Sequence, residues 1–119
     1  LQYILGQIFR FFAFAIGISW SESLLVGSLL GQKFVINEFV GYLSLAEMKA
    51  SGALSERAIM ISTYALCGFA NLSSIGIQIG GIGVMAPERR GDLSLLGFRA
   101  LIGASLATLM TAAIAGAIF

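Results

Sequence analysis

One carboxylate stands out because it lies between two apolar stretches. Glu38 comes shortly after Lys33, and uncharged runs flank the pair at residues 23–32 and 39–46. In a membrane such a charge costs roughly 2.5 kcal/mol or more, so its side chain must face a cavity or a partner. Glu38 is therefore the first candidate for a ligand-binding residue. The alternative is an ion pair with Lys33 that stabilises a turn.

A second group of polar side chains recurs with helical spacing. Tyr64, Asn71, Ser74 and Gln78 fall on one helical face. Amides and hydroxyls in this arrangement suit an uncharged ligand that is rich in hydroxyl groups. The alternative is hydrogen bonding between helices, which contributes only about 0.6 kcal/mol per bond in membrane proteins. The pattern leaves both interpretations open.

The residue types that are missing exclude several kinds of chemistry. The sequence contains no histidine and a single cysteine, Cys67, so zinc sites and histidine-based catalysis have no ligand or base. Ser73 therefore lacks an activating base, and we expect neither enzymatic activity nor a metal site. Seven basic and six acidic residues leave a net charge of +1, which provides no basic surface for nucleic acid.

The composition indicates a membrane protein. Of the 119 residues, 58% are hydrophobic and only 11% are charged, whereas about 25% are charged in a typical soluble domain. So few ionic groups cannot cover a surface that faces water. Because the chain begins at Leu1 rather than at a methionine, we expect it to be a piece of a longer protein.

The positions of the charges predict the long helices. Residues 93–119 carry only Arg99 and are long enough to cross roughly 30 Å of hydrocarbon as a last transmembrane helix. Residues 58–86 are uncharged, but one straight helix of that length would measure about 43 Å. A polar centre followed by glycines predicts a transmembrane helix over residues 57–86 that is broken near Asn71.

The remaining segments contain apolar runs that are too short to span a bilayer. Residues 19–50 are predicted to form a re-entrant helical hairpin with Lys33 and Glu38 near its tip. Asn37 is the predicted N-cap of the second arm, which places Glu38 at the positive end of that helix. Residues 1–18 are interpreted as the end of a helix, with a helix lying in the membrane interface as the alternative.

Two stretches permit a family to be named. Residues 31–42 read Gly-Gln-Lys-Phe-Val-Ile-Asn-Glu-Phe-Val-Gly-Tyr. This run resembles the Gly-x-Lys-x-x-x-Asn-Glu-Phe-Val-Ala-Tyr signature of the concentrative nucleoside transporters, and Gly41 is the one departure. Residues 64–76 read Tyr-Ala-Leu-Cys-Gly-Phe-Ala-Asn-Leu-Ser-Ser-Ile-Gly, and with residues 80–90 they resemble the broken helix and following loop of that family. The resemblance covers nearly the whole chain and corresponds to the C-terminal third of such a transporter.

The resemblance implies an all-α membrane protein, of which residues 1–119 form one half of an inverted-repeat transporter. It implies nucleoside uptake across the plasma membrane by alternating access, coupled to Na⁺ or H⁺ with no other cofactor. It also implies a homotrimer in the lipid bilayer. The substrate-binding residues that it implies are Glu38, Asn71, Ser74 and Phe69, with Asn37 and Lys33 in support.

In this family the nucleobase and cation sites lie mainly upstream of the region that this chain resembles. The implied role of the chain is therefore to supply the ribose-binding side of the site. The alternatives are a channel-like protein, or a structural membrane subunit in which the polar side chains only hold helices together.

Overall fold

The computed structural model describes residues 2–119, which fold entirely into helices and connecting turns and contain no strand. The predicted all-α class is confirmed. The six α-helices and one 3₁₀ turn, in chain order, are α1 (Gln2–Ala15), α2 (Ser23–Val35), α3 (Glu38–Ala50), α4 (Glu56–Leu66), α5 (Leu72–Met85), η1 (Pro87–Arg89) and α6 (Arg90–Ile118).

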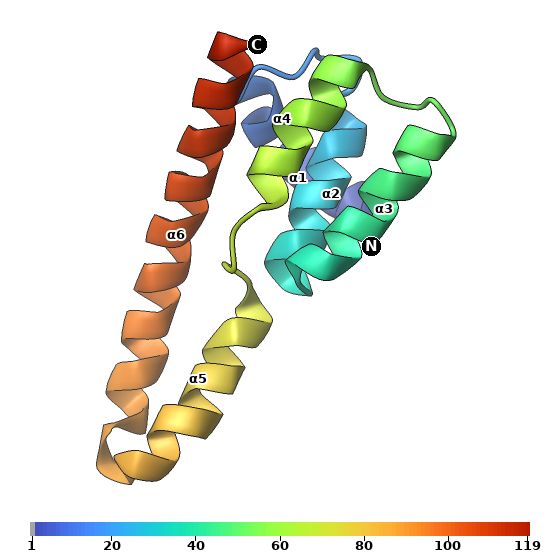
Figure 1. The fold of residues 1–119 in the computed structure, drawn as a ribbon. Helices are drawn as coiled ribbons and strands as arrows, with labels where there is room; N and C mark the ends of the chain where they lie inside the picture. Colours follow the sequence, from blue (N-terminus) through green and yellow to red (C-terminus); the bar gives the residue numbers. More distant parts are fainter. Residues whose placement is uncertain (1) are drawn as a thin grey trace.

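Helix α6 runs the length of the molecule, with α4 and α5 following one another along its side (Figure 1). The helical stretch Pro87–Ile118 is long and apolar enough to cross a membrane. It begins earlier than the predicted residue 93, because Pro87 stands at the first helical position, where proline needs no hydrogen-bond partner. Asp92 lies in the first turn of α6 and forms an ion pair with Arg89 at 3.1 Å. Its negative charge is stabilising there, because the N-terminus of a helix carries partial positive charge.

Helices α2 and α3 form a hairpin whose two arms are joined by Ile36 and Asn37. Asn37 has an extended backbone and its side chain accepts a hydrogen bond of 3.0 Å from the Val40 amide, so the predicted N-cap is confirmed. Farther from the turn, Ser44 Oγ donates to Gln32 Oε1 at 2.7 Å and ties the arms together. In Figure 1 the turn of the hairpin lies beside the gap between α4 and α5.

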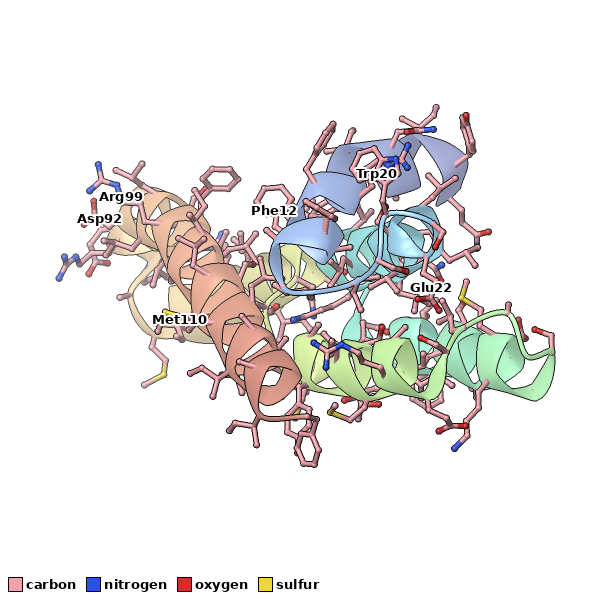
Figure 2. The ribbon with its side chains drawn as sticks, turned by 90° about the horizontal axis from the view of Figure 1, so that it is seen from above. Phe12, Trp20, Glu22, Asp92, Arg99 and Met110 are labelled. Atoms are coloured by element: carbon pink, nitrogen blue, oxygen red, sulfur yellow. The ribbon has the colours of Figure 1, made fainter. Side chains whose placement is uncertain are left out.

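Helix α1 crosses α2 where Gly6 and Gly27 let the two backbones approach closely. A Cβ atom at Gly27 would lie 2.6 Å from the Gly6 carbonyl oxygen and 2.7 Å from the Arg10 amide nitrogen. Only glycine permits this approach. Figure 2 shows Phe12 and Trp20 on the α1 side of the bundle, and the Arg10 guanidinium lies 3.9 Å from the centre of the Trp20 ring.

The buried core lies where α1, α2, α3, α4 and α6 meet, and its largest fully buried side chains include Leu29, Ile61 and Leu66. In contrast, α5 buries only Gly83. Many large apolar side chains of α5 and α6 are exposed, among them Met110, which projects from α6 in Figure 2. The core therefore holds the hairpin firmly against α4, and this packing sets the position of the hairpin turn beside the gap.

Candidate functional site

The gap between α4 and α5 is built by capping residues. Helix α4 ends at Leu66, and Asn71 has an extended backbone and begins α5. The Asn71 side-chain oxygen accepts hydrogen bonds of 2.8 Å from the backbone amide and from the hydroxyl of Ser74. The Ser74 hydroxyl also lies 3.3 Å from the Asn71 amide, which completes a capping box. The polar centre that indicated a break is thus the N-terminus of a second helix.

Glu38 contacts this N-terminus directly. The Asn71 Nδ2 atom donates a hydrogen bond of 3.2 Å to Glu38 Oε2. This bond joins the broken helix, to which Asn71 belongs, to the hairpin, to which Glu38 belongs. Asn71 is 3% exposed, whereas Glu38 is half-buried. Glu38 Oε1 accepts no hydrogen bond from residues 2–119. The carboxylate therefore keeps an unused acceptor at a place where two helix N-termini meet.

Lys33 does not pair with Glu38. Among residues 2–119, no ion pair joins these two side chains; the ion pair that the structure contains is between Arg89 and Asp92. Lys33 is 5% exposed, and its Nζ atom donates a hydrogen bond of 2.9 Å to the Ala65 carbonyl oxygen. The ion pair that was the alternative interpretation of Glu38 is therefore absent among residues 2–119.

A cavity of about 120 Å³ lies beside Asn71, between α5 and α6. Phe69, Ser74 and Gln78 line it from the gap and from α5. Small residues of α6 that were not predicted to belong to the site also line it, namely Gly97, Ala100 and Ala104. Their spacing along one helical face was the signal available. Phe69 is 79% exposed and stands at the edge of the gap. Glu38 does not line the cavity and reaches it through Asn71.

The predicted polar stripe is only partly preserved. Asn71, Ser74 and Gln78 share the cavity, whereas Tyr64 lines a separate pocket with Cys67 and Thr108. The reason is the break itself, because the chain between α4 and α5 no longer follows the helical repeat on which the stripe was counted.

Two hairpin residues make polar contacts that the sequence did not reveal. The Tyr42 hydroxyl donates to the Thr63 carbonyl oxygen at 2.8 Å. Gln32 is 3% exposed and bonds Ser44. Both residues lie within or beside the motif of residues 31–42, which was the signal that could have found them.

The arrangement as a whole suits a neutral ligand with hydroxyl groups. A half-buried carboxylate with a free oxygen can accept hydrogen bonds from hydroxyls, and the amide and hydroxyl of the α5 cap lie within reach of the same place. An exposed aromatic ring at the rim offers an apolar face.

Comparison with known proteins identifies the family of this chain. Residues 1–116 match the family described as Na⁺ dependent nucleoside transporter C-terminus. The chain is 47% identical over 116 residues to the uncharacterized transporter YutK of Bacillus subtilis, covering 98% of this chain and 28% of the relative. It is 44% identical over 117 residues to the putative nucleoside permease NupX of Escherichia coli, again covering 28% of the relative. It is 41% identical over 131 residues to sodium/nucleoside cotransporter 1 of Rattus norvegicus, covering 99% of this chain and 20% of the relative.

Solved structures are similar over the same region. The chain aligns with CNTnw in an inward-facing substrate-bound state with a TM-score of 0.88 and 49% identity, covering 98% of this chain and 29% of that one. It aligns with a double variant of CNTnw in an outward-facing state with the same TM-score and 48% identity, covering 98% and 28%. This chain therefore spans less than a third of the length of these relatives. On the match of residues 1–116, the chain belongs to the Na⁺-dependent nucleoside transporter family.

Proposed function

We propose that residues 1–119 are the C-terminal part of a cation-coupled nucleoside transporter and supply the ribose-binding side of its substrate site. The proposal draws on the relatives named as sodium/nucleoside cotransporter and nucleoside permease. The coupling ion is Na⁺ or H⁺, and the complete protein is a multi-pass homotrimer in the plasma membrane. The segment 19–50 enters the membrane as a re-entrant hairpin, and residues 57–86 and 93–119 cross it.

The observation that carries the proposal is the contact between Glu38 and Asn71. Ribose carries adjacent hydroxyl groups, and the free oxygen of Glu38 can accept a hydrogen bond from one of them. The Ser74 hydroxyl donates to Asn71 Oδ1. It can donate to the sugar instead without leaving Asn71 Oδ1 unpaired, because that oxygen also accepts from the Ser74 amide. Phe69 then covers the ligand from the rim of the gap, with Asn37 and Lys33 supporting the hairpin turn.

Transport proceeds by alternating access, with the hairpin and the broken helix moving together. Two observations support this movement as one body. The shared core packs α2 and α3 against α4. The chain also resembles an inward-facing and an outward-facing structure with the same TM-score of 0.88. In this scheme the chain is one half of an inverted repeat, and binding occurs where the helices are interrupted.

The test is uptake by the complete transporter that carries this chain. It is expressed in cells that lack nucleoside transport, and labelled uridine is measured inside and outside with and without a Na⁺ or H⁺ gradient. We expect accumulation against the uridine gradient, and we expect Glu38→Gln to reduce it while Glu47→Gln, a change of an exposed carboxylate on α3, does not. Downhill flux without accumulation would support a channel instead, and no flux of any nucleoside would refute the proposal.

A further inference from the structure

The last turn of α4 shows how the end of this broken helix is stabilised. The final four carbonyl groups of a helix have no partner within the helix. In α4 two of them bond locally: Tyr64 accepts from the Cys67 amide at 3.2 Å and Leu66 from the Gly68 amide at 2.8 Å. The carbonyls of the other two residues, Thr63 and Ala65, accept instead from side chains of the hairpin.

These two hairpin donors are Tyr42 and Lys33. The Tyr42 hydroxyl bonds the Thr63 carbonyl at 2.8 Å, and the Lys33 ammonium bonds the Ala65 carbonyl at 2.9 Å. Both partners of the second bond are buried, since Lys33 is 5% exposed and Ala65 is not exposed. A Cβ atom at Gly68 would lie 3.2 Å from Lys33 Nζ, so the chain beyond α4 also passes close to the ammonium.

The two charges near the hairpin turn match the two ends of the gap. A helix carries partial negative charge at its carbonyl end and partial positive charge at its amide end. Lys33 bonds the carbonyl end of α4, and Glu38 bonds the side chain that caps the amide end of α5. This explains why two opposite charges so close in sequence do not pair with each other.

The carbonyl ends of interrupted helices are places where secondary transporters bind free cations. We infer that Lys33 is a tethered cation: its ammonium occupies the carbonyl end of α4 in place of a free ion, and so positions the gap for Glu38 to reach Asn71. Lys33 is a positioning residue, because it contacts neither the cavity beside Asn71 nor the free oxygen of Glu38. The inference goes beyond the proposed function, which assigns Lys33 only general support.

Removal of the ammonium should expose a place that Na⁺ can occupy. The complete transporter is purified in detergent without nucleoside, as wild type and as Lys33→Met and Lys49→Met. Lys49 is the matched control, because it is an exposed lysine in the last turn of the same hairpin. Thermal unfolding is followed in NaCl and in choline chloride at equal ionic strength.

We expect Lys33→Met to melt below the wild type in choline, and to recover by about 2 °C or more in NaCl beyond any Na⁺ effect on the wild type. Lys49→Met should behave as the wild type in both salts. If Lys33→Met is not recovered as folded protein, Lys33→Gln, which keeps an N–H donor without the charge, is measured in the same way. Equal Na⁺ effects in the Lys33 variant and the wild type, or unchanged melting in choline, would overturn the inference.

The melting experiment involves neither uptake nor nucleoside, so its result is independent of the proposed function. A second readout rests on that function and separates positioning from general stability. The apparent KM for uridine should rise about tenfold in Lys33→Met, while that for 2′,3′-dideoxyuridine, which lacks both ribose hydroxyls, should change much less. An equal rise for both substrates would contradict a role in positioning Glu38 and Asn71.

Discussion

Asn71 Nδ2 donates a hydrogen bond of 3.2 Å to Glu38 Oε2, and each of these residues begins a helix. Asn71 is the N-cap of α5, and Glu38 is the first residue of α3. One carboxylate therefore lies between two helix N-termini, whose partial positive charge attracts a negatively charged side chain. A substitution of either residue should therefore change the contribution of the other to binding.

Coupling between Glu38 and Asn71 can be measured with a double-mutant cycle. We expect Glu38→Gln and Asn71→Ala each to weaken uridine binding by the complete transporter about tenfold or more, because a charge-assisted hydrogen bond is lost. The double variant should lose less uridine affinity than the product of the two single-variant losses predicts, since contacting residues couple by about 0.5–3 kcal/mol. Additive effects in uridine titrations would show that the two side chains act separately.

The cap at the hairpin turn should contribute to stability. Asn37→Ala removes the side-chain acceptor of the Val40 amide, and loss of such a cap costs about 1 kcal/mol. Asn37→Asp keeps an acceptor and should retain most of the stability. Thermal unfolding of the purified transporter compares the two variants. Identical melting of Asn37→Ala and Asn37→Asp would mean that the cap is not needed in the complete protein.

The crossing of α1 and α2 should not tolerate a methyl group. Gly27→Ala places a Cβ atom against the backbone of Gly6 and Arg10, so the helices must separate, at a cost of about 1–3 kcal/mol. Gly91→Ala is the control, because a Cβ atom there meets nothing within 4 Å. We expect Gly27→Ala to lower the unfolding temperature relative to the wild type and Gly91→Ala to leave it unlowered. Equal stability of the two variants would contradict the close approach.

The segment before α2 should show a dependence of stability on pH. Burial raises the pKa of Glu22. Hydrogen bonds donated by the Ser55 backbone and by the Ser19 and Ser55 hydroxyls lower the pKa by more than burial raises it, so the net pKa is below its ordinary value of 4.5. Because the folded-state pKa is depressed, this stabilisation is fully present above about pH 4.5 and is lost as the pH falls through the folded-state pKa.

Unfolding measured between pH 7 and pH 3 tests this expectation. Glu22→Gln should lower stability at neutral pH and should remove part of the acid-induced loss seen in the wild type. Glu47→Gln, which changes an exposed carboxylate of α3, serves as the control. The same acid profile in the wild type and in Glu22→Gln would show that these bonds do not contribute.

Local features of the sequence were enough for the helical class and for several helix ends. Asn37 caps α3, and the polar run at Asn71 marks a helix N-terminus. Each of these depends on residues within one or two turns, where the link between residue type and backbone conformation is direct. The motifs of residues 31–42 and 64–76 likewise lie in continuous sequence, so the family could be named from them.

Partners across the fold could not be read in the same way. The sequence placed Lys33 and Glu38 close together and so favoured an ion pair as the alternative to a site. It also placed Tyr64 on the same face as Asn71. The placement of Tyr64 assumed a helical repeat that continued through residues 67–71, where the structure has no helix.

The sequence by itself determined which residues carry charge and polarity inside an apolar chain, because composition and spacing need no knowledge of packing. Only the tertiary structure decided that Lys33 bonds Ala65 and that Glu38 bonds Asn71. The physical reason is the buried core of α2, α3 and α4, which holds the hairpin turn beside the gap and presents each charge to the helix end of opposite sign.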